Sequence, residues 1–221
     1  MANYFSYLPD FEYVSRLPGA TISDYKKVKN IFKRGVLRED IFQNLSFFTK
    51  YQVKGDDRPD NVANEVYDDP DLDWLVLISN NIINFQSEWP LTQLEFDAFL
   101  LEKYGTYAKI NEAHHYETVE IKSNSGAIIV NEGLQVESDF SISFYDTKIG
   151  QQVTVNNSAV PVTNYEYEEG LEDKKRDIFL LKPEYVNVVI DDLEEMMLYK
   201  KGSTQYVSET LKRADNVRLY Q

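Results

Sequence analysis

The chain has 221 residues, of which 43% are hydrophobic, enough to bury the core of one or two modest domains. Asp and Glu (37) outnumber Lys and Arg (23), and the net charge of -14 argues against nucleic acid or an anionic membrane surface as a partner. The absence of cysteine excludes disulfides, thiolate nucleophiles and thiolate metal sites.

The first residues lack the basic and apolar regions of a signal peptide. No apolar run reaches the roughly 18 residues expected of a membrane span. We therefore expect a soluble, unsecreted protein.

Residues 1–50 predict an aromatic arm followed by a helix. Aromatic residues stand among prolines and a glycine in the first twenty positions with no clear period, which favours an extended arm. Ser23 can cap a helix that carries Tyr25, Val28 and Phe32 on one face and ends at Gly35.

Residues 51–90 predict a strand followed by two helices. Tyr51-Gln52-Val53 alternates like a short strand, and Gly55 begins a turn. Pro59 suits the first position of one helix, and Asp69 can cap a second helix that contains Trp74. The sequence therefore predicts a compact unit at this place.

Residues 91–113 contain a further helix. Thr92 and Glu95 have the spacing of a capping box, and Gly105 supplies a stop. The apolar residues between them recur at helical spacing, so we expect one face of this helix to be buried.

Within residues 114–177, the period changes to two from Tyr116 to Thr163, with turn residues between the alternating runs, which predicts a small antiparallel β region. The stretch from Tyr165 to Asp177 is rich in charges of both signs and is interpreted as a solvated connection.

Residues 178–221 predict an amphipathic helix and a polar tail. The helix begins at Pro183, runs to Lys201 and is closed by Gly202. Ile190 and Leu193 lie on its apolar face. We expect that face to dock on the protein's own core or on a neighbouring chain, and the tail from Ser203 to Gln221 to remain polar.

Catalytic and cofactor sites find little support. The glycines never form a Gly-x-Gly pair, which excludes the glycine-rich phosphate-binding loops. The adjacent His114 and His115 match no familiar ligand spacing, so a surface or packing role is favoured over a metal or catalytic one. We expect no catalytic residue, no cofactor and no metal.

Two groups of acids have structural explanations. Asp69-x-Asp71-x-Asp73 has the spacing that opens a calcium loop, but a calcium loop needs Gly and Glu where this chain has Trp74 and Asn80. The start of a helix explains these acids better. The acids from Asp191 to Glu195 are interpreted as the solvated face of the last helix rather than as an acid-base pair.

Part of the chain resembles a LysM module, a family that folds as βααβ and often binds glycans containing N-acetylglucosamine. The stretches that carry this resemblance are Tyr51-Gln52-Val53-Lys54-Gly55-Asp56, Asn61-Val62-Ala63-Asn64-Glu65-Val66-Tyr67 and Trp74-Leu75-Val76-Leu77-Ile78-Ser79-Asn80-Asn81.

A more specific resemblance surrounds that stretch. The matching residues, in order, are Lys54-Gly55, Arg58-Pro59, Ala63-Asn64, Tyr67, Pro70-Asp71-Leu72, Trp74, Trp89 and Thr92-Gln93, with Phe11-Glu12-Tyr13, Ile31-Phe32-Lys33-Arg34 and Ile178-Phe179-Leu180-Leu181-Lys182 in agreement. They look like the baseplate wedge subunit of T4-like contractile-tailed phages. The resemblance covers residues 1–105 and the last helix, whereas residues 114–177 match no family pattern.

The resemblance implies a structural subunit of the virion tail, assembled in the host cytoplasm. Such a subunit contacts other baseplate wedge proteins and joins neighbouring wedges of the six-fold inner baseplate. Nucleic acid and membrane are not expected as partners, and no enzyme activity is expected. The alternative from another class is a glycan-binding module that recognises peptidoglycan near Gly55 and Asn80; an enzyme acting through carboxylates is a third, less supported reading.

The expected fold class is α+β: a LysM-like βααβ unit with flanking helices, a small antiparallel β region and a C-terminal amphipathic helix. The residues predicted to define the fold or make interactions are Tyr51, Gly55, Pro59, Tyr67, Trp74, Trp89, Ile190 and Leu193.

Overall fold

The computed structural model describes residues 3–21 and 24–214. It is 37% helical and 26% strand, which confirms the α+β class. The chain forms two compact units: unit 1 comprises Met1–Trp89 and Arg176–Gln221, and unit 2 comprises Pro90–Lys175. Unit 2 is therefore an insertion between the two halves of unit 1. Among the described residues, no helix combines the length and the apolar character needed to cross a bilayer.

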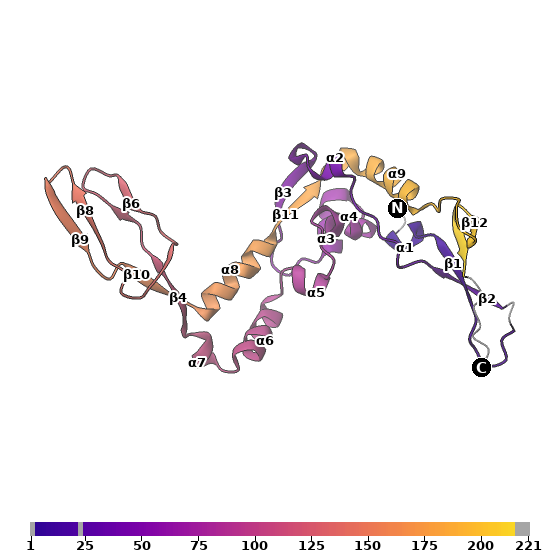
Figure 1. The fold of residues 1–221 in the computed structure, drawn as a ribbon, viewed down its shortest axis with the longest axis horizontal. Coiled ribbons are helices and arrows are strands. Elements are labelled where there is room, and N and C mark those ends of the chain that lie inside the picture. Colours follow the sequence, from indigo (N-terminus) through magenta and orange to yellow (C-terminus); the bar gives the residue numbers. More distant parts are fainter. Residues whose placement is uncertain (1–2, 22–23, 215–221) are drawn as a thin grey trace. The chain divides into compact units, whose positions relative to one another are not determined.

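Figure 1 shows the helices and strands of unit 1 together with those of unit 2. In order, those of unit 1 are α1 (Tyr4–Tyr7), β1 (Asp10–Val14), β2 (Tyr25–Lys29), α2 (Glu39–Phe42), η1 (Leu45–Phe47), β3 (Phe48–Gln52), α3 (Pro59–Tyr67), η2 (Pro70–Leu72), α4 (Asp73–Ser79), α5 (Phe85–Glu88), β11 (Asp177–Leu181), η3 (Pro183–Tyr185), α9 (Val186–Met197), β12 (Tyr206–Ser208) and β13 (Leu211–Arg213).

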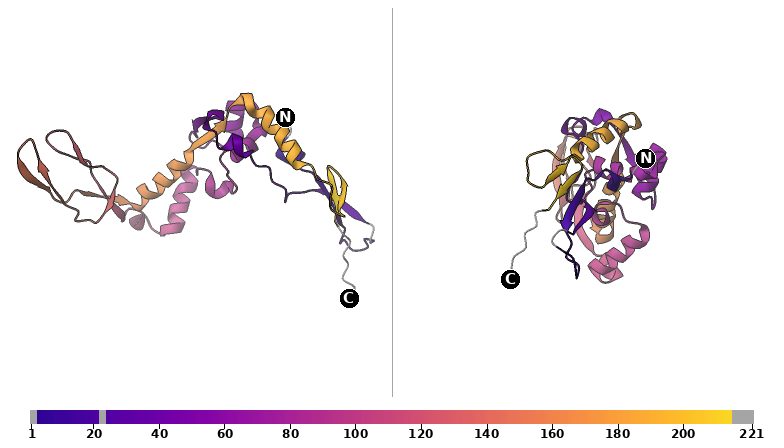
Figure 2. Two further views of the ribbon diagram at one scale, coloured as in Figure 1. Left: turned by 45° about the horizontal axis from the view of Figure 1, so that its top comes forward. Right: turned by 90° about the vertical axis from the view of Figure 1, so that its right-hand side faces the viewer.

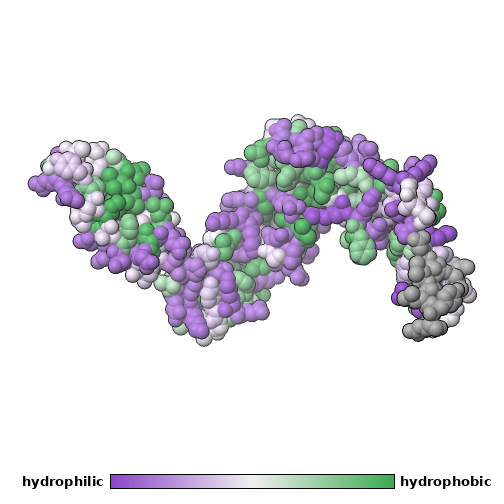
Figure 3. All heavy atoms as spheres, viewed as in Figure 1, coloured by the Kyte–Doolittle hydropathy of each residue, from purple (hydrophilic) through white to green (hydrophobic). Residues whose placement is uncertain are grey.

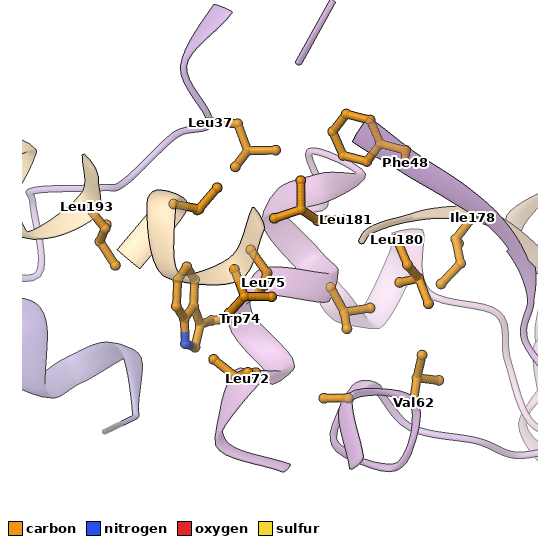
Figure 4. Packing of buried hydrophobic residues seen from close by; sticks show 14 of the residues in the cluster. Leu37, Phe48, Val62, Leu72, Trp74, Leu75, Ile178, Leu180, Leu181 and Leu193 are labelled. Atoms are coloured by element: carbon orange, nitrogen blue, oxygen red, sulfur yellow. The ribbon is translucent and has the colours of Figure 1, made fainter. Parts of the chain in front are cut away.

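The core of unit 1 lies between a two-stranded ribbon and helices α3, α4 and α9. Strand β3 pairs antiparallel with β11, with Phe48 opposite Leu181 and Gln52 opposite Asp177. Buried side chains from these elements and from neighbouring segments of unit 1 form one hydrophobic cluster, part of which is drawn in Figure 4. The members of the cluster that are at most 2% exposed are Leu8, Val53, Val62, Ala63, Leu72, Leu75, Val76, Leu180, Leu181 and Leu193.

A second feature of unit 1 is a four-stranded sheet in the order β12-β13-β1-β2. Strands from both halves of unit 1 meet there, because β1 pairs parallel with β13 and antiparallel with β2. Figure 2 shows these strands from two further directions. The polar tail expected from Ser203 onward is thus partly wrong, since β12 and β13 complete this sheet; residues 215–221 lie outside the described residues.

The predictions for residues 1–35 are wrong in two respects. The aromatic arm is not wholly extended, because α1, capped by the Asn3 side chain, packs Tyr4 and Tyr7 on Trp74. The helix expected after Ser23, which itself lies outside the described residues, is strand β2. The apparent helical face was accidental: Phe32 is 96% exposed, and pairing with β1 supplies the backbone bonds instead.

Unit 2 begins with α6 (Gln93–Tyr104), where Thr92 and Glu95 form the predicted capping box and Gly105 ends the helix with φ of 79°. After α7 (Tyr107–Ile110), the predicted antiparallel β region is confirmed. Its strands are β4 (Ala113–Thr118), β5 (Ile121–Lys122), β6 (Ile128–Val130), β7 (Gln135–Val136), β8 (Ile142–Asp146), β9 (Gln151–Val155) and β10 (Ala159–Thr163).

The stretch predicted as a solvated connection is helix α8 (Asn164–Arg176), so that prediction is wrong. Thr163 and Glu166 form a capping box, since each donates a backbone N–H to the other's side chain. Glu168 is buried and accepts hydrogen bonds from Lys103 Nζ (2.7 Å) and Tyr104 Oη (2.8 Å) on α6. The charged stretch thus contributes a buried carboxylate, that of Glu168, to the contact between α8 and α6.

Helix α9 is shorter than the predicted Pro183–Lys201. It ends at Met197, and Lys33 Nζ donates to the carbonyls of Met196 (2.7 Å) and of the C-cap residue Leu198 (2.8 Å), which satisfies two carbonyls at this end of the helix. Its apolar face packs into the core of unit 1 through buried residues that include Leu193 (1% exposed), while Ile190 is half-buried against the cluster. Of the two docking alternatives, the structure shows docking on the protein's own core.

Candidate protein-protein interface

The predicted residues on β3 and α3 lie in or beside the core of unit 1. Pro59 is buried at the first position of α3. The Tyr67 hydroxyl donates to Leu181 O (2.8 Å), and burial raises the pKa of Tyr67. The Tyr51 hydroxyl donates to Glu65 Oε2 (2.7 Å), and the pKa of Tyr51 is raised by burial and then by Glu65. These side chains hold α3 against both strands of the ribbon.

Both tryptophans are buried. Trp74 is 5% exposed and lies near the rings of Tyr4 and Tyr7, so the expectation that Trp74 is a core residue is confirmed. Trp89 is 4% exposed, and its Nε1 donates to Asp57 O (3.0 Å). The Nε1 of Trp74 is buried and has no hydrogen-bond partner in the described part of the chain. A buried donor without a partner is uncommon and costs about 1 to 3 kcal/mol.

The turn at Gly55 and the end of α4 are held by contacts within unit 1. Gly55 has φ of 51° and its carbonyl accepts from Arg176 Nη1 (2.8 Å). Asn80 Nδ2 donates to Phe179 O (2.9 Å), while Phe179 N donates to Asn80 Oδ1 (2.8 Å). The polar groups at which the glycan hypothesis placed recognition are therefore engaged in the fold.

The order strand, helix, helix expected for residues 51–90 is present as β3, α3 and α4. The strand that pairs with β3, however, is β11, which follows the inserted unit 2. The LysM-like assignment itself stays a prediction.

The three acids that suggested a calcium loop are arranged as a helix start. Asp69 caps η2 by accepting from Asp71 N (2.9 Å), and Asp73 Oδ1 accepts from Trp74 N (2.7 Å). Burial raises the pKa of Asp73. Across the described ranges 3–21 and 24–214, no three His, Cys, Asp or Glu side chains are grouped to hold a metal ion.

The two histidines of unit 2 have packing contacts. The His114 ring stacks on Tyr167 with a centroid distance of 3.9 Å, and His115 Nε2 lies 2.9 Å from Glu117 Oε1. His115, Glu117 and Tyr167 also line a cleft of about 750 Å³ in unit 2. The contacts agree with the packing role favoured by the sequence.

Unit 1 carries an apolar groove of about 290 Å³. Its walls include three exposed apolar side chains, Phe5 (62% exposed), Ile31 (69%) and Ile83 (69%). The remaining lining residues are Tyr4, Leu8, Lys33, Arg34, Trp74, Leu77, Ile78 and Ile82. Exposed apolar residues that gather in one groove indicate a binding surface, whereas isolated ones are ordinary.

Hydrophobic side chains also gather over the strands of unit 2 in Figure 3. The exposed large hydrophobic residues of unit 2 include Ile128, Leu134, Tyr145 and Ile149. Neither surface was predicted from the sequence. The adjacent pairs Ile31-Phe32 and Ile82-Ile83, each next to turn residues, are the sequence features that could have indicated the groove.

The exposed apolar residues that gather in the groove are typical of a surface that contacts other proteins. A search of curated proteins gives no match. A family model described as Base plate wedge protein 53 matches residues 4–197. The chain therefore belongs to the Base plate wedge protein 53 family and is a structural component of a phage tail baseplate.

Proposed function

We propose that this chain joins neighbouring wedges of a six-fold inner baseplate by holding other wedge proteins through its exposed apolar surfaces. The family membership places the chain in the virion tail. The joining role is our inference. We also infer that the baseplate assembles in the host cytoplasm and that this chain catalyses no reaction.

The observation that carries the proposal is the groove of unit 1, whose three exposed apolar side chains lie over a well-packed core. Leaving Phe5, Ile31 and Ile83 in water is unfavourable, and covering them with another chain would remove apolar surface from water at roughly 25 cal/mol per Å². A subunit that joins chains needs such a surface.

The insertion of unit 2 supports the same role. Unit 2 leaves unit 1 after Trp89 and returns at Arg176, and it has a small hydrophobic cluster of its own around Phe96, Leu100 and Ile110. One chain thus presents two separately packed surfaces, each with exposed apolar residues. Two surfaces are what a link between two neighbours requires.

Three carboxylates have partners within the fold, as a structural role requires. Glu65 pairs with Lys54, Asp192 pairs with Arg38, and Glu168 is held by Lys103 and Tyr104. These carboxylates serve contacts between elements of the fold.

The test is a phage that cannot make this chain, with the wild-type gene supplied in trans as the control. Electron microscopy and sedimentation of the assembly intermediates would be compared. We expect single wedges to accumulate without the chain and closed six-fold baseplates to return with it. Closed baseplates at normal yield without the chain would contradict the joining role.

A further inference from the structure

In the four-stranded sheet of unit 1, strand β2 forms an edge whose outward backbone N–H and C=O groups can be identified. In the ladder between β1 and β2, Asn30 N donates to Pro9 O (2.8 Å), and Ser15 N donates to Asp24 O (2.7 Å). Residues of an antiparallel strand alternate between bonding the partner strand and facing away from it. The backbone groups of Tyr25, Lys27 and Lys29 therefore face away from β1.

No described strand pairs with that edge, because β2 ends the order β12-β13-β1-β2. Within this edge the carbonyl of Lys29 accepts from Ile31 N (3.1 Å), which turns the chain toward the groove. Ile31 then lines the groove itself. The free edge and the apolar groove thus lie in the same unit, and only Asn30 separates the end of β2 from Ile31 in the groove wall.

The segments that form and adjoin the four-stranded sheet have a net positive charge, whereas the whole chain has a net negative charge. Residues 8–35 and 198–214 contain ten basic side chains against four acidic ones, in a protein whose net charge is -14. The basic residues are Arg16, Lys26, Lys27, Lys29, Lys33, Arg34, Lys200, Lys201, Lys212 and Arg213, and the acidic ones are Asp10, Glu12, Asp24 and Glu209. Asp10 pairs with Lys27 and Lys29, and Glu12 pairs with Arg213. The excess of six positive charges, ten minus four, attracts an acidic partner.

The groove adds a second, independent observation. Trp74 lines the groove, is 95% buried, and its indole N–H has no partner among the described residues. A buried N–H without a partner is uncommon, and here it belongs to a side chain that lines the groove. Arg34, which also lines the groove, can pair with an acid at its rim.

We propose that this surface binds an extended, acidic segment of another baseplate protein, which adds a strand to the free edge of β2 and places apolar side chains in the adjoining groove. This inference rests on the proposed joining function and names the chemistry of the partner. Main-chain hydrogen bonds give such a complex its affinity, and side-chain pockets give it specificity.

Lysines on an edge strand can also serve simply to prevent association with other strands. That explanation covers Lys26, Lys27 and Lys29, but it leaves unexplained an apolar groove that begins two residues after the strand ends. Nucleic acid would satisfy the basic side chains, yet it offers neither strand pairing for the backbone groups nor apolar side chains for the groove. An acidic protein strand accounts for all three features.

The first test measures binding of synthetic probes to the full-length protein. One peptide alternates glutamate with valine and ends in leucines, a second has lysine in place of glutamate, and the third probe is a short DNA duplex. We expect the glutamate peptide alone to bind, with an affinity that falls as salt is raised. Equal binding of the lysine peptide, or tighter binding of DNA, would overturn the proposal.

Variants locate the binding. The double variant Lys26→Glu and Arg34→Glu should lower the affinity for the glutamate peptide by about tenfold or more. The double variant Lys26→Arg and Arg34→Lys should retain the wild-type affinity. Lys50→Glu with Lys109→Glu, which changes exposed lysines elsewhere, is the matched control and should bind as the wild type does. The same loss in the control pair would overturn the assignment to this surface. Ile83→Ser tests the groove separately and should also weaken binding.

The second test uses assembled tails that carry a photo-crosslinking amino acid at Phe32 or at Ile83. We expect each to cross-link to a baseplate protein, at a segment with more Asp and Glu than Lys and Arg. Tails that contain the chain but show cross-links only to basic segments or DNA, or none at all, would overturn this inference and leave the joining function standing. Tails that lack the chain would overturn both.

Discussion

Asn80 and Phe179 hold each other through two reciprocal hydrogen bonds, Asn80 Nδ2 to Phe179 O (2.9 Å) and Phe179 N to Asn80 Oδ1 (2.8 Å). The Asn80 side chain thus acts toward β11 as a backbone amide of a neighbouring strand would. Through it, the end of α4 is fixed to a strand that lies 99 residues later in the sequence. The contact joins the two halves of unit 1 across the inserted unit.

A first prediction follows for glycans. Because Asn80 is bound to Phe179 and the Gly55 carbonyl to Arg176, these groups are not free to recognise a sugar. We expect no binding of the purified protein to chitin oligomers or peptidoglycan in pull-down and calorimetry. A dissociation constant below about 100 μM, or roughly 5.5 kcal/mol, would instead favour the glycan-binding hypothesis.

The second prediction concerns Trp74. Trp74→Ala should lower the free energy of unfolding by about 3 to 5 kcal/mol, since it opens a cavity under Tyr4 and Tyr7. Trp74→Phe should cost much less, because it keeps an aromatic ring and removes an indole N–H that has no partner among the described residues. Denaturant unfolding measures both. Equal losses for the two variants would show that the indole N–H matters to the fold.

The third prediction compares two glycines. A Cβ at Gly35 would lie 2.3 Å from Leu193 Cδ1, and Leu193 is only 1% exposed, so Gly35→Ala should destabilise the protein by about 1 to 3 kcal/mol. Gly170 lies within α8 and a Cβ there meets nothing within 4 Å. Gly170→Ala should stabilise by about 0.5 to 1 kcal/mol. Unfolding midpoints that move in the same direction for both would contradict this packing of α9.

The fourth prediction is a pH dependence in unit 2. Asp146 is 1% exposed, and the backbone N–H of Asn124, with further donors at Lys148 and the Asn124 side chain, lowers the pKa of Asp146 below its usual value. A lowered pKa means that the ionised form stabilises the fold above the unfolded-state pKa of about 3.9, and that this contribution is lost as the pH falls further.

Thermal unfolding of the wild type and of Asp146→Asn should therefore differ most above about pH 5 and converge in more acidic solution. Asp139→Asn, at an exposed carboxyl in the same unit, is the control and should follow the wild type. A difference between wild type and Asp146→Asn that stayed constant down to about pH 2 would show that the charge of Asp146 is not what matters.

Local chemistry explains which parts of the fold could be predicted. Thr92, Glu95 and Gly105 act within one helix, and their spacing alone predicted α6 and both of its ends. Thr163 and Glu166 have the same spacing, and the helix there was missed because the many charges that follow were interpreted as a solvated connection. The capping box was the better guide, since a charged helix can be held by a few buried pairs such as Glu168 with Lys103.

Long-range pairing explains what could not be predicted. Tyr25, Val28 and Phe32 have helical spacing, yet β2 forms because β1 and β13 provide a sheet for it to join. In the same way β3 pairs with β11, and nothing near residue 51 indicates a partner after residue 176. The groove likewise depends on Phe5, Ile31 and Ile83, which only the tertiary fold brings together.

The most direct test of the joining role is electron cryomicroscopy of the intact tail, at a resolution that traces this chain. We predict six copies in the inner baseplate, each in contact with proteins of two neighbouring wedges, with the groove beside Ile83 covered by another chain. Copies that each contact a single wedge, and leave that groove open to solvent, would contradict the account.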